Sequence, residues 1–495
     1  MSGSRGSSDH LPEGVDREDL DLLADGSVIG RIERHWRSRA SWPQLRDVDG
    51  TWVSSTELEE RSRLAANRLR GSGLAKGDRI VLIAESSARM VTAYLAALRA
   101  GLIVVPINPA YTAGEIAKIV RSAHPAAAVV ERDHHAAAVR TAADRPLPIA
   151  GLELDLQDAG SDRLETPSGD DPALLIYTSG TTGEPKGALL SHANLLASAT
   201  AVALAWRWQP RDRLLLTLPL FHVHGLGVGV NGSLCAAGQI VLRERFDPRD
   251  VAERCAEGIT MFFGVPAMYH RLATQGAQAL GRLRLVVSGS APLPAALAYE
   301  LKRQTGQVPL ERYGMTETVM LTSNPYEGQR KPGTVGFPLP GVELRLAADG
   351  EVLVNGPNVI AGYYQRPDAD AEAFTDDGWF RTGDLGDLDQ DGYLTIVGRS
   401  KDLIITGGYN VYPREVEEVL GAHPKISEVA VVGRPSEEWG EEVTAVVVAG
   451  QPVGERELKA LAAAHLAPYK VPKRIEFVPE LPRNALGKLL RAKLK

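Results

Sequence analysis

Residues 177–188 of this chain read Tyr177-Thr178-Ser179-Gly180-Thr181-Thr182-Gly183-Glu184-Pro185-Lys186-Gly187-Ala188. An apolar run at 173–176 precedes this stretch and predicts a buried strand. The glycines allow the backbone to bend and to approach a ligand closely. The serine and threonine hydroxyls can donate hydrogen bonds to phosphate oxygens, and Lys186 adds a positive charge. The stretch therefore predicts a phosphate-binding loop that follows a strand.

This loop differs from the common nucleotide-binding pattern G-x-x-x-x-G-K-[ST], which the chain lacks. A conventional P-loop fold is therefore disfavoured. The alternative is a flexible surface loop without a ligand, and the motifs further along the chain argue against it.

Composition is typical of a globular protein with more than one domain. A chain of 495 residues suggests two or three domains, and 44% hydrophobic and 24% charged residues are ordinary values. The net charge of −7 gives no electrostatic case for a nucleic-acid partner. The two cysteines, Cys235 and Cys255, cannot build a disulfide framework and fit a reducing compartment.

Neither a secretory signal nor a membrane span is predicted. The first nine residues are polar, and apolar stretches such as 102–106 are far shorter than the roughly 20 residues that a membrane helix needs. We therefore expect a cytoplasmic protein with no membrane partner.

Helix-like and strand-like segments alternate through the first part of the chain. Apolar spacing predicts helices at 54–70, 90–99 and 115–123, and further helices capped by Ser191 and by Asp247. Short apolar runs predict strands at 79–83, 102–105, 214–219, 260–264 and 283–288. This alternation predicts parallel sheets with helices on their faces.

The pattern changes after about residue 334, where short strands are separated by Asp-Gly and Asn-Gly turns. A compact α+β unit is then predicted over 402–495. The expected fold class is α/β, with a large N-terminal domain of parallel α/β sheets plus a small β subdomain. A small, mobile α+β domain is expected at the C-terminus.

Further motifs follow the phosphate loop: Arg312-Tyr313-Gly314-Met315-Thr316-Glu317, Arg381-Thr382-Gly383-Asp384, Gly398-Arg399-Ser400-Lys401-Asp402 and Pro482-Arg483-Asn484-Ala485-Leu486-Gly487-Lys488. In this order they resemble the motifs of the acyl-adenylate-forming enzymes: acyl-CoA synthetases, peptide-synthetase adenylation domains and firefly luciferases. The nearest likeness is to malonyl-CoA and methylmalonyl-CoA synthetases. The resemblance implies an N-terminal domain at 1–398, a hinge at 399–401 that contains Lys401, and a lid domain at 402–495.

The resemblance and the chemistry of these side chains imply a site for ATP and Mg²⁺. Thr316 is expected to donate to the α-phosphate, and Glu317 offers an oxygen ligand for Mg²⁺. Tyr313 is expected to stack on adenine, and Asp384 suits the ribose hydroxyls, with Arg399 as its partner. The expected ATP-binding residues are Thr178, Ser179, Gly180, Thr181, Thr182, Gly183, Lys186, Tyr313, Gly314, Met315, Thr316, Asp384 and Arg399.

Lys488 resembles the lysine that the family's lid brings to the reaction centre. Its expected role is to bridge the substrate carboxylate and the α-phosphate during adenylation. Because acylation would remove its charge, Lys488 is also a candidate for regulation by acylation.

The resemblance also implies CoA as the thiol acceptor. Gly407 and Gly408 lack side chains and can pass close to a narrow pantetheine arm. Lys470 and Lys473, with Arg474, form a basic cluster that is expected to meet the CoA phosphates. A solvated surface cluster is the alternative.

The acyl pocket is expected to involve His222, Val223, Ser288 and Met315, with His222 gating the pocket or contacting the reacting carboxylate. A histidine packed in the core is the alternative for His222. Because side chains two apart on a strand share a face, Arg284 is expected deeper on the wall that Ser288 lines. A buried arginine needs an anion, so a short dicarboxylate such as malonate or methylmalonate is the preferred substrate. In the alternative, Arg284 lies outside the pocket and pairs with a nearby acid.

Other functions stay open on the sequence. An acyl-CoA synthetase for a short or aromatic monocarboxylate would use the same chemistry. A stand-alone adenylation domain would load a carrier protein, although its usual aspartate is replaced here by His222. A nucleotide-binding regulator without catalysis would have lost a catalytic group, and none of the expected groups is missing.

Overall fold

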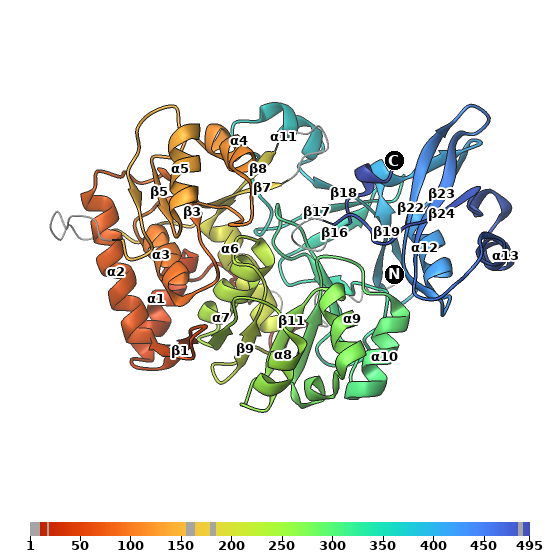
Figure 1. The fold of residues 1–495 in the computed structure, drawn as a ribbon. Helices are drawn as coiled ribbons and strands as arrows, with labels where there is room; N and C mark the ends of the chain where they lie inside the picture. The colour runs from red at the N-terminus through yellow and green to blue at the C-terminus, as the bar shows by residue number, and fades with distance from the viewer. Residues whose placement is uncertain (1–9, 17–18, 155–163, 179–184, 484–488) are drawn as a thin grey trace.

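The computed structural model describes residues 10–16, 19–154, 164–178, 185–483 and 489–495. Figure 1 shows the chain after β19 (Leu394–Arg399) gathered in a smaller unit at one side of the molecule, drawn in blue. The larger part contains two α/β sheets and a small antiparallel sheet. This arrangement confirms the predicted fold class.

The first α/β sheet has the strand order β6-β5-β3-β4-β7-β8, with β7 and β8 antiparallel and the other neighbours parallel. Val81 of β3 packs with α4 and α5, whereas its neighbour Leu82 packs with α2 and α3, as the alternation of side chains along a strand requires. The bounds are α2 (Ser55–Gly71), β3 (Arg79–Ile83), α3 (Ala88–Arg99), β4 (Ile103–Pro106), α4 (Ala113–Ala123), β5 (Ala127–Val130), α5 (Asp133–Ala142), β6 (Ile149–Ala150), β7 (Pro172–Thr178) and β8 (Lys186–Ser191).

The second α/β sheet has the order β15-β14-β13-β12-β11-β9-β10-β1-β2 and is parallel from β13 to β1. One face packs against α8, α9 and α10 through side chains such as Phe262 and Val286. The bounds are β1 (Pro43–Arg46), β2 (Trp52–Ser54), β9 (Arg213–Leu216), β10 (Gln239–Leu242), α8 (Pro248–Cys255), β11 (Met261–Gly264), α9 (Pro266–Gln275), β12 (Leu285–Ser288), α10 (Ala295–Thr305), β13 (Leu310–Tyr313), β14 (Thr322–Ser323) and β15 (Phe337–Pro338). Because the central strands are parallel, Ser288 and Tyr313 end at the same edge, where α/β sheets usually bind ligands.

A π-helical segment, η2 (His224–Val230), follows β9 and leads into α7 (Asn231–Cys235). Gly225 is the second residue of this segment, and a side chain there would collide with the carbonyl of Pro219. The sequence did not predict this segment, because its glycines weaken any helical pattern. It places His222 and His224 at the carboxyl edge of the second sheet.

The remaining sheets are the antiparallel β16-β17-β18-β19 sheet and the β21-β20-β23-β22 sheet, to which β24 adds beside β23. The latter carries α12 and α13 over a core of its own. The bounds are β16 (Glu343–Leu346), β17 (Glu351–Asn355), α11 (Pro367–Ala373), β18 (Phe380–Leu388), η4 (Ser400–Asp402), β20 (Ile404–Thr406), β21 (Tyr409–Val411), α12 (Pro413–Gly421), β22 (Ile426–Ser436), β23 (Gly440–Ala449), α13 (Glu455–His465) and β24 (Arg474–Phe477). The predicted domain boundaries at 398 and 402 stay a prediction.

Within the described part of the chain, no helix combines the length and the apolar character that a membrane crossing requires.

The helix that follows the phosphate loop, α6 (His192–Ala205), is capped as predicted. The Ser191 hydroxyl accepts a hydrogen bond from the Asn194 amide at 3.1 Å, and the Asn194 side chain accepts one from the Ser191 amide at 2.9 Å. Asn194 also donates to the carbonyls of Pro357 and Val359, each at 2.9 Å. The cap therefore joins α6 to the segment that follows β17.

We expect Ser191→Ala to destabilise the protein by about 1 kcal/mol, because the substitution removes the cap acceptor. In a protein of this size the midpoint of thermal unfolding should fall by roughly 1–3 °C. Ser191→Asp keeps an acceptor at the helix start and is the matched control. An equal loss in both variants would show that the cap is not the cause.

Candidate active site

The ribose motif is built around the carboxylate of Asp384, which lies opposite Arg399 in the β18–β19 pairing. The Arg399 guanidinium is 2.9 Å from one carboxylate oxygen of Asp384. The hydroxyl of Tyr313 donates to the other oxygen at 2.6 Å. Each oxygen keeps a further lone pair that can accept a ribose hydroxyl. The predicted partners Tyr313, Asp384 and Arg399 therefore lie together.

Burial and the adjacent Asp384 carboxylate hold the pKa of Tyr313 well above its usual range. Tyr313 is therefore a neutral hydrogen-bond donor at physiological pH. Because its hydroxyl is bonded to Asp384, the ring is held at the carboxyl end of β13. The predicted stacking of this ring on adenine stays a proposal.

Glu317 lies buried behind this group and accepts a hydrogen bond from the Tyr363 hydroxyl at 3.0 Å. The ammonium group of Lys186 lies 5.6 Å from the centre of the Tyr363 ring. Tyr363 therefore connects the lysine of the phosphate loop to the predicted metal ligand. Sequence analysis missed Tyr363, because its position depends on a bridge to Ala188 across a long sequence separation.

Glu317 fits the role of a magnesium ligand. Burial raises the pKa of Glu317, because low-dielectric surroundings disfavour the charged carboxylate. Among the described residues no cluster of three or more His, Cys, Asp or Glu side chains forms a metal cage. Mg²⁺ is usually held by one or two carboxylates together with substrate phosphates and water, so a single buried carboxylate is compatible with binding.

The loop after β13 brings Thr316 to the same edge of the sheet. A side chain at Gly314 would collide with the carbonyl of Val319, so the turn requires glycine. Asn358 fixes the far side of the loop, since its amide donates to the carbonyls of Thr318 at 2.9 Å and Met320 at 2.8 Å. Thr316 is buried within this rigid turn.

Several predicted residues lie outside the described part of the chain. They are Ser179, Gly180, Thr181, Thr182 and Gly183 of the phosphate loop, and Lys488. The described ends of the loop, Thr178 and Lys186, pair with each other across β7 and β8.

A hollow of about 230 Å³ lies beside this site. His222, His224 and Ser290 line it, together with Phe246 and Arg271. The amide of His224 donates to Nδ1 of His222 at 3.1 Å, and Nδ1 of His224 lies 3.1 Å from the Ser290 hydroxyl. Burial, followed by the nearby Arg312 and His222, holds the pKa of His224 well below its usual range, so His224 stays neutral. His222 thus lies at a pocket, and its role there stays a proposal.

The other predicted acyl-site residues do not line this hollow. Val223 packs in the hydrophobic core, and the partly buried Met315 packs against this core. Ser288 is buried, and its hydroxyl has no hydrogen-bond partner among the described residues. Val286, on the same strand face as Ser288, packs under α9 and α10.

The structure corrects the prediction for Arg284. Its guanidinium forms two hydrogen bonds with the buried carboxylate of Asp212, at 2.6 and 2.5 Å, and a third with the carbonyl of Trp206 at 3.0 Å. Arg284 precedes β12 and lies at the amino edge of the sheet, opposite the edge where Ser288 and Tyr313 end. Its charge is already neutralised, so it does not serve as a substrate anchor. The structure agrees with the alternative interpretation, in which Arg284 lies outside the pocket and pairs with a nearby acid.

Arg312 is the arginine that sequence analysis missed. It is buried, it pairs with no carboxylate among the described residues, and two of its guanidinium nitrogens have no hydrogen-bond partner there. Burial lowers the pKa of Arg312 to about 9. The guanidinium lies in the space that a side chain at Gly289 would occupy. The positive charge thus lies at the carboxyl edge of β12, next to the pocket residue Ser290.

The predicted CoA residues lie on the smaller unit. Gly407 and Gly408 form the turn between β20 and β21 with φ values of +56° and +81°, a conformation that favours glycine. Lys470 is paired with Glu415, with its ammonium 2.6 Å from the carboxylate, so its charge is balanced within the protein. The Lys473 ammonium lies 4.8 Å from the centre of the Trp439 ring.

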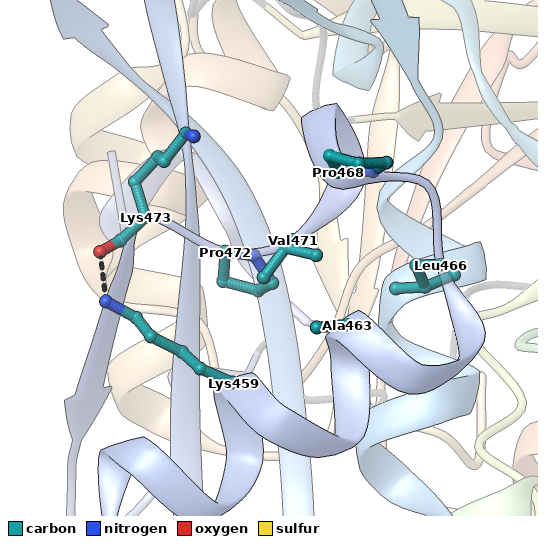
Figure 2. Close-up of a pocket in the computed structure, with 7 residues that line it drawn as sticks. All are labelled: Lys459, Ala463, Leu466, Pro468, Val471, Pro472 and Lys473. Atoms are coloured by element: carbon teal, nitrogen blue, oxygen red, sulfur yellow. Dashed lines mark hydrogen bonds between the residues drawn. The ribbon is translucent and has the colours of Figure 1, made fainter.

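A groove of about 430 Å³ lies between α13 and the segment 468–473 (Figure 2). Lys459 donates to the carbonyl of Lys473 at 2.5 Å across one end of this groove, and the ammonium end of Lys473 points away from Lys459. All residues that line this groove lie between 459 and 473, and none of them belongs to the group around Asp384 and Glu317. We therefore do not assign the reaction to it.

Lys401 lies in η4, the short helix that directly follows Arg399. Partial burial and the neighbouring Arg399 lower its pKa. Its predicted role as the hinge stays a proposal.

Comparison with known proteins identifies the family. The sequence matches the AMP-binding enzyme model over residues 32–364 and the model of the AMP-binding enzyme C-terminal domain over 415–488. A feruloyl-CoA synthase from an Amycolatopsis species is 36% identical, with 90% of this chain and 94% of the relative covered. A malonate–CoA ligase from Arabidopsis thaliana is 35% identical, with 86% of this chain and 79% of the relative covered. ATP-bound MatB from Rhodopseudomonas palustris has a TM-score of 0.88 and 38% identity, with 94% of this chain and 98% of that chain covered.

The chain belongs to the AMP-binding enzyme family. Within this family it is an AMP-forming acyl-CoA synthetase, and it uses ATP, Mg²⁺ and CoA.

We expect Glu317→Gln to raise the KM for Mg-ATP about tenfold or more, because the substitution removes the negative charge of the side chain and keeps nearly the same shape. In the unmodified enzyme the KM for Mg-ATP should rise as the pH falls, because the raised pKa of Glu317 lets protons compete with Mg²⁺ closer to neutral pH. This pH dependence should disappear in Glu317→Gln. Steady-state kinetics across pH tests it, with Tyr363→Phe as the control that removes only the hydrogen bond. An unchanged Mg²⁺ requirement in Glu317→Gln would contradict the assignment.

We expect Arg284→Ala to destabilise the fold by about 3–5 kcal/mol, because it leaves the buried Asp212 without its partner. The preference among acids should not change. Denaturant unfolding and pyrophosphate release with two acids measure both effects. Arg303→Ala is the control, since its partner Glu300 is on the surface. A selective loss on dicarboxylates would restore the predicted substrate role.

Proposed function

We propose that this enzyme joins a short dicarboxylic acid, malonate or methylmalonate, to CoA. In the first step a carboxylate oxygen of the acid attacks the α-phosphorus of ATP, and pyrophosphate leaves. In the second step the CoA thiol loses its proton and attacks the acyl carbon, and AMP leaves. The products are the acyl-CoA, AMP and pyrophosphate.

The observation that carries the choice of acid is the unpaired charge of Arg312. A buried guanidinium without an anion is costly, and a substrate carboxylate would compensate it in a bidentate contact. Arg312 is a residue of β13 near its carboxyl end, and its guanidinium lies near His224 and beside Gly289, where we place the acid. It therefore replaces Arg284 as the proposed anchor for the second carboxylate.

The relatives and the size of the hollow support this choice. The Arabidopsis relative is a malonate–CoA ligase, whereas the relative from Amycolatopsis is a feruloyl-CoA synthase. The hollow of about 230 Å³ is smaller than the sites of drug-sized ligands, which are typically about 300–1,000 Å³. A small pocket beside the unpaired cation Arg312 favours the shorter, doubly charged acid.

The remaining residues take the roles that the family motifs imply. Thr316 and Lys186 hold the ATP phosphates, Glu317 holds Mg²⁺, and Asp384 and Arg399 hold the ribose. His222 contacts the reacting carboxylate, and Lys488 approaches when the lid domain rotates about Lys401. Regulation by acylation of Lys488 and a cytoplasmic location stay predictions.

We expect Arg312→Met, which removes the charge and keeps much of the volume, to lower kcat/KM for malonate by about 2–5 kcal/mol in transition-state free energy. The kcat/KM for butyrate should stay the same or increase in this variant. Pyrophosphate release with ATP, Mg²⁺ and CoA measures both, across acetate, butyrate, benzoate, malonate, methylmalonate, succinate and amino acids. Arg330→Met, a half-buried arginine that donates to backbone carbonyls, is the control for general damage.

Equal losses on malonate and butyrate would contradict the anchor role. A preference of the unmodified enzyme for a monocarboxylate would keep the synthetase chemistry and reject the dicarboxylate. Turnover only with amino acids would support the carrier-loading alternative.

A further inference from the structure

Arg414 of α12 connects the smaller unit to the larger part of the molecule. Its guanidinium donates one hydrogen bond to the carbonyl of Ile396 in β19 and another, at 3.1 Å, to the carbonyl of Gly333. A third partner is the carboxylate of Glu418, one turn further along α12, at 2.8 Å. The side chain of Arg414 is 13% exposed, so water competes little for these contacts. The two bonds to carbonyls therefore cross from the smaller unit to the larger part.

The contact at Gly333 continues to a strand of the candidate active site. The amide of Gly333 donates to the buried carboxylate of Glu311 at 2.8 Å. Burial raises the pKa of Glu311 to about 7, and the Gly333 amide and the charge of Arg414 oppose this rise. Glu311 directly precedes Arg312 and lies on the same strand as Tyr313. Arg414 is thus linked through one glycine to the strand that carries two of the site residues.

In this orientation of the smaller unit, the turn at Gly407 and Gly408 faces solvent. Both glycines are exposed, and Tyr409 after them is 57% exposed. The family motifs imply that this turn contacts the pantetheine arm of CoA, whose thiol has to reach a buried reaction centre. A turn that lines such a passage has to lie against the larger part of the molecule. The second step of the proposed reaction therefore requires another orientation of the smaller unit.

A change of orientation about the predicted hinge at 399–401 breaks the contacts of Arg414 with the larger part. Gly333 and Ile396 precede the hinge, whereas α12 follows it. β21 directly precedes α12, so the turn at 407–408 and Arg414 move together. Two hydrogen bonds from a charged donor, which are stronger than bonds between neutral groups, have to open before the turn can reach the reaction centre.

We propose that Arg414 is a positioning residue that holds the smaller unit in the described orientation and has to release Gly333 and Ile396 before CoA can react. The proposal rests on the two-step reaction of the proposed function, and it does not depend on which acid the enzyme selects. The orientation that accepts CoA is then a minor state of the free enzyme. The apparent affinity for CoA is reduced by the fraction of molecules in that state.

Loss of the arginine should therefore improve the apparent affinity for CoA. In Arg414→Ala the KM for CoA should fall about tenfold, because the bonds of a charged donor no longer oppose the change of orientation. Arg414→Lys keeps the charge but lacks the planar fork, so its KM should fall less. Glu311→Gln keeps an acceptor for the Gly333 amide and removes the nearby negative charge, and it should also give a smaller fall. Arg456→Ala, an exposed arginine on α13, is the matched control and should have the KM of the unmodified enzyme.

The first step is measured separately as acid-dependent exchange of pyrophosphate into ATP, without any thiol. Arg414→Ala should not accelerate this exchange, because the contacts of Arg414 oppose only the orientation that accepts CoA. A gain confined to the thiol step is not expected from general damage to the fold.

A distance measurement tests the orientation without any reactant. Tyr299→Cys on α10 and Phe477→Cys on β24 replace exposed side chains, one in each part of the molecule, whereas the native Cys235 and Cys255 are buried. Spin labels on the two introduced cysteines report the distance between the parts by pulsed electron paramagnetic resonance. One main distance is expected without Arg414→Ala, and a second population is expected with it.

Three outcomes would overturn the proposal. An unchanged or higher KM for CoA in Arg414→Ala would mean that the contacts do not oppose the second step. Equal losses in pyrophosphate exchange and in the thiol step would assign Arg414 to the stability of the fold. A single, unchanged distance in the labelled variant would show that other contacts fix the orientation. A failure of the proposed function would appear separately, as an unmodified enzyme without acid-dependent exchange, and the distance measurement would still decide the role of Arg414.

Discussion

The carboxylate of Asp384 joins parts of the structure that are distant in the sequence. It accepts from Tyr313 at the end of the second α/β sheet and pairs with Arg399 at the end of the small antiparallel sheet. A buried carboxylate that loses one partner becomes costly, so both contacts have to form together. The proposed ATP site therefore lies at the junction of two sheets, directly before the turn that leads to the smaller unit.

The arginines of this protein illustrate how burial and pairing decide function. Arg284 is held by Asp212 and by a backbone carbonyl, so its guanidinium contributes to the fold. Arg312 is buried more deeply and has no carboxylate near it among the described residues. The physical difference is the missing counter-charge, because an unpaired cation in a low-dielectric site attracts an anionic ligand strongly.

The proposed sites for the nucleotide and for the acid lie next to each other. Thr316 and Glu317 are buried in the loop after β13, and the hollow that His222 and Ser290 line is at the same carboxyl edge of the sheet. In the proposed reaction the acid is activated in the first step and transferred in the second, which is consistent with its proposed place between Arg312 and His222.

The sequence by itself determined the order of helices and strands, the caps at Ser191 and Asp247, and the motifs that contain Tyr313, Glu317, Asp384 and Arg399. These features depend on local periodicity and on residue types at short spacing, and the structure brings the motif residues together as expected. The tertiary structure alone decided the partner of Arg284, the bridging position of Tyr363 and the unpaired state of Arg312. The partner of a buried charge is set by residues far away in the chain, such as Asp212, and a strand pattern contains no information about them. A single strand therefore predicts the face on which a charged residue lies, whereas only the packed sheets decide whether its charge is already neutralised or is free for a ligand.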